Sequence, residues 1–104
     1  MAKKKSFGLD DVLTIENGAE EREYYASLQR AINSGSAWSL QGSYGRTMMD
    51  AISAGRCVLG TAPAFDYWGN RIPSRTEVQD GTKGSTGFVT ENSGPDWATW
   101  IASL

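Results

Sequence analysis

The chain has 104 residues, of which 39% are hydrophobic and 21% are charged, and its formal net charge at neutral pH is −2. A chain of this size and composition buries one hydrophobic core, so we expect a single small domain over residues 9–104. The charge argues against a broadly basic nucleic-acid-binding protein, and the absence of histidine excludes Ser-His-Asp and Cys-His catalysis and removes the commonest zinc ligand. We therefore expect a protein that is not an enzyme and uses no metal or cofactor.

Residues 1–8 are expected to form a flexible basic tail. Lys3, Lys4 and Lys5 are not followed by the apolar run of a secretory signal, and no later stretch is apolar enough to span a membrane. The single cysteine, Cys57, cannot form an intrachain disulfide, which agrees with a reducing compartment. The sequence therefore predicts a cytoplasmic protein, and an alternative role for the lysines is an arm that contacts phosphate groups.

The first predicted element is a helix over about residues 19–34. Its apolar residues recur at spacings of three and four, and acidic residues lie near its start, where the helix dipole is positive. Gly35 is expected to end this helix in a left-handed conformation. Residues 37–40 form a short apolar run and are predicted to be a strand.

A second unit then repeats the same order of helix, glycine and strand. Ser43 is the expected N-cap of a helix over about residues 44–54, and Gly55 is its expected end. Residues 56–59 repeat the extended apolar run, and their composition favours burial of Cys57. Two units are too few for a repeat solenoid, so an α+β domain is predicted.

A hairpin is predicted over residues 66–73, with a Gly-Asn reversal between two short strands. Pro73 should either confine the returning strand to the edge of a sheet or end it, because proline cannot donate a hydrogen bond to a neighbouring strand. Residues 79–87 are rich in glycine, threonine and serine and are predicted to be a loop. Residues 88–89 are predicted to add one more short strand.

The last predicted element is a short amphipathic helix over about residues 96–104. Pro95 lies near its first position, and its apolar residues include Trp97 and Trp100. We expect these tryptophans to pack on the core, and the alternative is an exposed anchor for a partner. The predicted fold is thus α+β, with three helices and a small, mostly antiparallel sheet of short strands.

The start of the second helix is a candidate anion-binding site. Ser43, Gly45 and Arg46 combine a cap hydroxyl, a glycine turn and an arginine at a helix start, which is how proteins hold phosphate or carboxylate groups. The pattern lacks the lysine and the spacing of a P-loop, and an ordinary capped turn is the simpler interpretation.

The predicted hairpin, extended to residue 75, is a candidate protein-binding surface. Its aromatic, arginine and asparagine side chains are suited to recognition: Tyr67, Trp68, Asn70, Arg71 and Arg75. Because neighbours on a strand point to opposite faces, one of Tyr67 and Trp68 is expected to face the core. The two arginines are expected to be exposed, and these residue types also stack on nucleic-acid bases.

Three stretches of the sequence resemble small uncharacterised proteins encoded by bacteriophages and prophages. They are WSLQGSYGR at residues 38–46, DYWGNRIPSR at residues 66–75 and GTKGS at residues 81–85. The resemblance extends over about half of the chain and assigns no residue a role. It implies a setting, the cytoplasm of an infected bacterium, where small proteins that bind host or phage components are common.

These observations predict a non-enzymatic binding protein that acts through a protein–protein surface including the hairpin. The alternative is an anion-binding or nucleic-acid-binding protein that uses the lysine tail together with Ser43, Arg46, Arg71 and Arg75. Phosphate-driven binding weakens steeply as salt rises, so a titration with oligonucleotides at two salt concentrations distinguishes the two predictions.

Overall fold

The computed structural model describes residues 21–40 and 43–104, and the predicted basic tail at residues 1–8 lies outside them. In chain order the elements are α2 (Glu21–Ser34), the 3-10 helix η1 (Ser36–Ser39), α3 (Tyr44–Ser53), β1 (Ala64–Phe65), β2 (Arg71–Ile72), α4 (Thr86–Ser93) and α5 (Pro95–Ala102). The described part of the chain is α+β, as predicted, but it contains four α-helices where the sequence predicted three.

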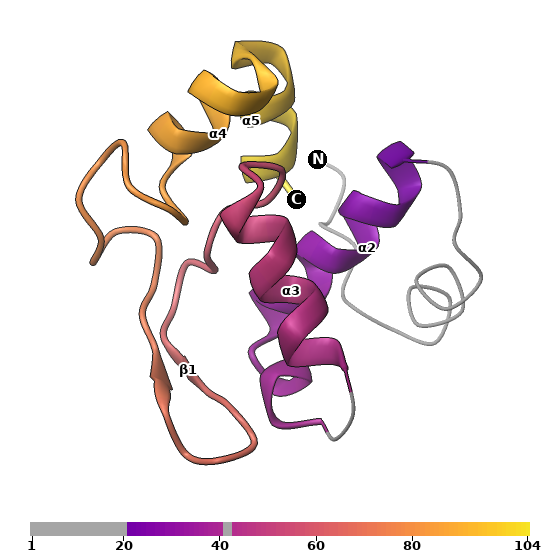
Figure 1. Ribbon diagram of the computed structural model, residues 1–104, viewed down its shortest axis with the longest axis vertical. Helices are drawn as coiled ribbons and strands as arrows, with labels where there is room; N and C mark the ends of the chain where they lie inside the picture. The colour runs from indigo at the N-terminus through magenta and orange to yellow at the C-terminus, as the bar shows by residue number, and fades with distance from the viewer. Residues whose placement is uncertain (1–20, 41–42) are drawn as a thin grey trace, which may run out of the picture.

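Helices α2 and α3 pack against each other, and α4 and α5 form a helical pair at one end of the molecule (Figure 1). The hairpin of β1 and β2 lies beside α3, and its turn is at the end opposite α4 and α5. One hydrophobic core joins these elements, and its largest fully buried apolar side chains are Leu28, Ile32, Met48, Val58, Val89 and Ile101.

The two predicted glycine helix ends are confirmed. Gly35 and Gly55 follow α2 and α3 with φ angles of 76° and 73°, a conformation in which a Cβ atom is strained. Beyond Gly55 the chain folds back, and the N–H of Arg56 donates to the carbonyl oxygen of Ala51 (3.0 Å). Ser43 precedes α3 as predicted, but its side chain makes no capping hydrogen bond.

The predicted strand at residues 37–40 is wrong, because this segment forms η1. The chain coils after Gly35, and the N–H of Leu40 donates to the carbonyl oxygen of Ala37 (3.2 Å). This turn buries Trp38, which is only 3% exposed. The apolar run therefore reaches the core through a helical turn and needs no partner strand.

The predicted strand at residues 56–59 does not join a sheet, because a side chain occupies the place of the neighbouring strand. The Gln29 amide donates from Nε2 to the carbonyl oxygen of Val58 (2.9 Å), and its Oε1 accepts from the Val58 N–H (2.9 Å). Both backbone groups are thus satisfied inside the core. Cys57, next to Val58, is fully buried, as predicted.

The predicted strand at residues 88–89 is also wrong, because these residues belong to α4. The Ser85 hydroxyl accepts a hydrogen bond from the N–H three residues later (3.2 Å), which caps the start of the helix. Val89 points into the core from this short helix. Gly94, with a φ angle of 94°, separates α4 from α5, and Pro95 lies in the first turn of α5.

The prediction that Trp97 and Trp100 pack on the core is confirmed. Trp97 donates from Nε1 to the carbonyl oxygen of Arg56 (2.8 Å), and its ring packs edge-to-face on Tyr25 and Trp100, with centroids 6.0 and 5.0 Å away. The Arg22 guanidinium lies 4.1 Å from the centroid of the Trp100 ring. These contacts hold α5 against α2, away from the turn of the hairpin.

Candidate binding pocket

The hairpin has a very short ladder. Strands β1 and β2 pair antiparallel, with Ala64 opposite Ile72 and Phe65 opposite Arg71. The returning strand ends immediately before Pro73, as predicted. Because a two-residue pairing holds its turn weakly, the shape of the turn depends on side-chain hydrogen bonds.

Asp66 supplies these hydrogen bonds. Its Oδ1 accepts from the N–H groups of Trp68 (2.9 Å) and Asn70 (2.8 Å), and its Oδ2 accepts from Asn70 Nδ2 (3.2 Å). Desolvation acts to raise the pKa of Asp66, but hydrogen bonds from Asn70, Trp68 and Gly69 outweigh it and lower the pKa below its ordinary value. The Asp66 carboxylate is therefore ionised at neutral pH, and both of its oxygens accept hydrogen bonds from residues of the turn.

Tyr67 and Trp68 both project from this turn, so the prediction that one of them faces the core is wrong. Their side chains are 49% and 79% exposed. The two residues lie in a turn and not in a strand, so the alternation that places neighbours on opposite faces does not apply. Their rings pack edge-to-face, with centroids 5.2 Å apart.

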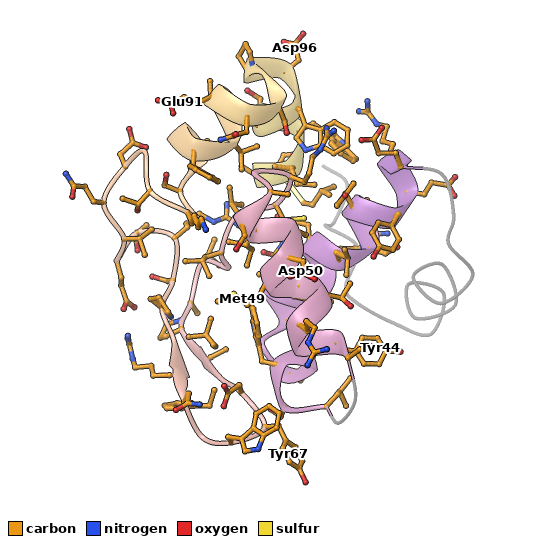
Figure 2. All side chains as sticks on the ribbon, in the orientation of Figure 1. Tyr44, Met49, Asp50, Tyr67, Glu91 and Asp96 are labelled. Atoms are coloured by element: carbon orange, nitrogen blue, oxygen red, sulfur yellow. The ribbon has the colours of Figure 1, made fainter. Side chains whose placement is uncertain are left out.

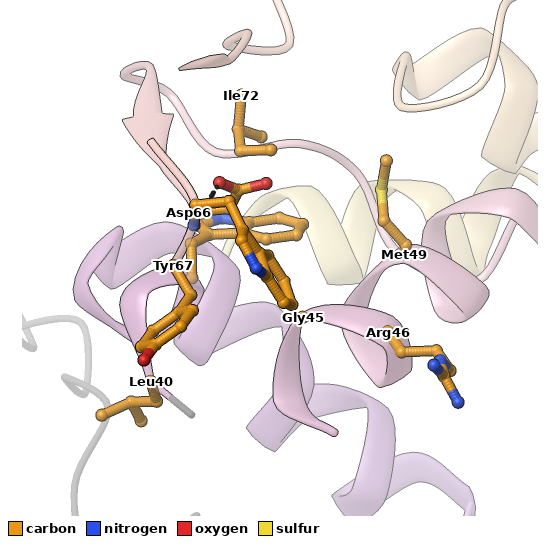
Figure 3. Close-up of a pocket in the computed structure, with 9 residues that line it drawn as sticks. Leu40, Gly45, Arg46, Met49, Asp66, Tyr67 and Ile72 are labelled. Atoms are coloured by element: carbon orange, nitrogen blue, oxygen red, sulfur yellow. Dashed lines mark hydrogen bonds between the residues drawn. The ribbon is translucent and has the colours of Figure 1, made fainter. Parts of the chain in front are cut away.

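A pocket of about 290 Å³ lies between this turn and residues 45–49 of α3 (Figure 3). Its apolar lining consists of Trp38, Leu40, Met49, Tyr67, Trp68 and Ile72. Figure 3 shows Leu40 and Tyr67 on one side and Met49 and Arg46 on the other. Trp38 is buried and Ile72 is half-buried, whereas the remaining apolar residues are exposed.

Exposed apolar surface is concentrated at this pocket. Among the described residues, five large hydrophobic side chains are exposed, and four of them line the pocket: Leu40, Met49, Tyr67 and Trp68. The fifth, Phe65, is 58% exposed and precedes the turn of the same hairpin. Clustered exposed apolar residues of this kind mark interaction sites in soluble proteins.

The structure brings together parts of the two predicted sites. Gly45 and Arg46, from the predicted anion-binding pattern, line the same pocket as Tyr67 and Trp68 from the hairpin. A Cβ atom at Gly45 would meet no atom within 4 Å, so the backbone there borders open space. Ser43 does not line the pocket and makes no capping bond.

The comparisons with known proteins give a family but no activity. Residues 1–66 match the family model of a domain of unknown function, DUF7417. The chain belongs to the DUF7417 family. No curated protein and no solved structure matches it. In the part of this DUF7417 chain that the structure describes, no helix is both long and apolar enough to cross a membrane.

The pocket extends across the boundary of the DUF7417 match. The matched residues run through α2, η1, α3 and β1 and end at Asp66, the residue that holds the turn. Tyr67, Trp68 and Ile72 follow the matched segment, and the other lining residues lie within it: Trp38, Leu40, Gly45, Arg46, Met49 and Asp66.

The other predicted hairpin residues are engaged within this DUF7417 chain. Asn70 bonds to Asp66, and Arg71 donates from both terminal nitrogens to the Glu77 carboxylate, at 2.6 and 2.9 Å. The hydrogen bond and the charge of Glu77 raise the pKa of Arg71 above its ordinary value. Neither Asn70 nor Arg71 lines the pocket.

Arg75 is not part of the hairpin surface, and the expectation that it is exposed is wrong. Its guanidinium donates to the carbonyl oxygens of Leu59 (2.7 Å) and Ala102 (3.2 Å) and to Oδ1 of Asn33 (3.3 Å). Asn33 also donates from Nδ2 to the carbonyl oxygen of Leu104 (3.0 Å). Arg75 therefore joins three distant segments of the DUF7417 chain, and burial lowers its pKa below the ordinary value.

Five pocket residues were missed by the sequence reasoning: Trp38, Leu40, Met49, Asp66 and Ile72. Asp66 and Ile72 lie within the predicted hairpin, but neither was predicted to be part of a site. Met49 carried a signal, because it lies off the stripe of buried apolar residues that Met48, Ala51 and Ile52 form on α3. An apolar residue on the polar side of an amphipathic helix indicates a surface contact. Leu40 and Trp38 had no such signal, since the apolar run that contains them was predicted to be a strand.

Proposed function

We propose that the protein is a small non-enzymatic binding protein that captures an apolar side chain of a partner protein in the pocket beside the hairpin turn. One observation carries the proposal: four of the five exposed large apolar side chains of the described chain surround a single pocket. Leaving this surface in water is costly, because covering one large apolar side chain is worth about 1.5–3 kcal/mol.

The size of the pocket supports an anchor side chain as its occupant. At about 290 Å³ it is at the small end of ligand pockets, which measure roughly 300–1,000 Å³. A single aromatic or branched side chain from a peptide fits this scale better than a cofactor does. Tyr67 and Trp68 at the rim belong to the residue types that dominate binding energy at protein interfaces.

The alternative, binding to nucleic acid or another phosphate-bearing ligand, has weaker support. Two of its three arginines are engaged, since Arg71 pairs with Glu77 and Arg75 bonds inside the fold. Only Arg46 remains at the pocket, and phosphate-driven affinity requires several cations at once. The lysines of the predicted tail lie outside the described residues.

The setting that goes with this function is also a proposal. A cytoplasmic location agrees with the single buried cysteine, and the resemblance to phage and prophage proteins suggests a host protein or a phage protein as the partner.

Selection from a displayed library of random peptides, followed by affinity measurements on two variants, tests the proposed function. Trp68→Ala removes a wall of the pocket, whereas Phe65→Ala removes an exposed aromatic ring that does not line it. Selected peptides should bind Trp68→Ala at least tenfold more weakly than the wild type, which is a loss of about 1.4 kcal/mol or more in binding free energy. They should bind Phe65→Ala with unchanged affinity. Thermal melts of both variants check that the fold is intact.

Two results would contradict the proposal. One is a set of selected peptides that bind both variants equally well, because the pocket would then have no part in recognition. The other is tight binding of single-stranded oligonucleotides that weakens steeply with salt, with no peptide selected, which would establish the alternative function.

A further inference from the structure

The two charged residues that line the pocket, Asp66 and Arg46, differ in whether their side chains are already hydrogen-bonded within the protein. Asp66 is the acidic residue of the lining, and its two oxygens already accept three hydrogen bonds within the turn. Arg46 is the basic residue of the lining, and its side chain makes no ion pair or hydrogen bond with another residue that the structure describes. A positive charge is therefore available at the rim, whereas the negative charge is not.

The start of α3 adds to this positive side. The first turn of α3, residues 44–47, contains no acidic residue to offset the positive end of the helix dipole. Gly45 and Arg46 in this turn line the pocket, and Figure 3 shows Arg46 on the side opposite Tyr67 and Leu40. The nearest acidic residue along the helix, Asp50, lines a different hollow between α2 and α3.

We propose that the partner is a peptide segment with a bulky apolar residue flanked by aspartate or glutamate. The apolar side chain enters between the aromatic turn and Met49, which lies between α3 and the hairpin in Figure 2. The flanking carboxylate pairs with Arg46, whose planar guanidinium is suited to a two-pronged contact with it. This inference rests on the proposed function and adds the chemistry of the partner.

A second copy of the chain is a poorer occupant. A symmetric dimer through this face would bring two Arg46 side chains near each other, and the pocket offers no uncommitted carboxylate to compensate them. A nucleic acid is a poorer occupant too, because one free arginine does not supply the cations that phosphates need. A peptide with both an apolar and an acidic residue can fill the apolar pocket and also pair with Arg46.

The test compares peptides selected from a random library by the wild-type protein and by two charge variants. Arg46→Glu reverses the charge at the pocket rim, and Lys83→Glu makes the same change of charge at an exposed residue that does not line the pocket. The wild type should enrich acidic residues beside a bulky apolar one. Arg46→Glu should enrich basic residues in that position and bind the wild-type peptides about tenfold more weakly, whereas Lys83→Glu should behave as the wild type does.

The outcomes separate this inference from the proposed function. Peptides that need Trp68 but show no charge preference overturn the acidic partner and leave the pocket as a protein-binding site. Peptides that bind Trp68→Ala as well as the wild type overturn both. A dimer in sedimentation experiments that Met49→Lys dissociates would overturn the acidic peptide in favour of a second copy.

Discussion

Alanine substitution should have different costs at the two glycine helix ends, although their φ angles are nearly the same. Gly35 and Gly55 have φ angles of 76° and 73°, so alanine at either position adds a strain of about 1–2 kcal/mol. A Cβ atom at Gly35 would lie 3.6 Å from the Cβ of Ala64, which is an ordinary contact. A Cβ atom at Gly55 would lie only 2.4 Å from the Cβ of Asn92.

The overlap at Gly55 can be relieved only by moving α4, because the conflicting atom of Asn92 is attached directly to its backbone. Overpacking of this kind adds about 1–3 kcal/mol to the strain, so Gly55→Ala should lower the free energy of unfolding by about 2–5 kcal/mol. Gly35→Ala should lower it by about 1–2 kcal/mol. In a domain of this size the Gly55→Ala loss corresponds to a fall in Tm of roughly 10–25 °C.

Urea denaturation of both variants measures these losses, and a double-mutant cycle identifies their cause. Asn92→Gly removes the conflicting Cβ atom, so Gly55→Ala should cost at least about 1 kcal/mol less in the Asn92→Gly background than in the wild type. Equal losses at Gly35 and Gly55, together with no coupling to Asn92, would refute the reasoning.

The remaining predictions concern the arginines, the cysteine and an acidic residue. Arg75→Ala should lower the free energy of unfolding by about 2–4 kcal/mol, because three partly buried acceptors lose their donor. Arg71→Ala should leave the denaturation midpoint nearly unchanged. Equal losses of stability in the two variants would contradict the internal role of Arg75. Burial raises the pKa of the Cys57 thiol, so a thiol reagent at mildly alkaline pH should label the native protein slowly and the unfolded protein rapidly; rapid native labelling would contradict burial. The hydrogen bond from Arg71 holds the pKa of Glu77 below its ordinary value, so its stabilising contribution is present above the ordinary carboxyl range and is lost as pH falls through the folded-state pKa. Thermal melts should show a shallower acid-side loss for Glu77→Gln than for the wild type.

The sequence predicted those parts of the fold that depend on neighbouring residues. The glycine ends of α2 and α3, the hairpin turn and the proline at the start of α5 all follow from local backbone preferences. The segments at residues 37–40 and 88–89 were predicted incorrectly, because short apolar runs do not distinguish a strand from a buried helical turn. The conformation of each segment depends on how its buried side chain, Trp38 or Val89, packs in the hydrophobic core.

The candidate site could be predicted only as two separate halves. Residues 45–46 and 67–68 are far apart in the sequence, and no local pattern indicates that they share a pocket. Arg75 was assigned to a surface site because of its residue type, but its side chain bonds inside the fold. Its hydrogen-bond acceptors belong to α2, to Leu59 and to α5. Only the tertiary structure supplies those acceptors.

The contact between Gln29 and Val58 also has a consequence for how the protein opens. The Val58 N–H donates to the Gln29 side chain of α2, so its proton exchanges with solvent only when α2 separates from residues 56–59. Local fraying of either element alone leaves the hydrogen bond in place. Hydrogen exchange at the Val58 amide therefore reports the opening of the core. A glutamate at position 29 would still accept a hydrogen bond from this amide, but it would have no donor for the Val58 carbonyl oxygen.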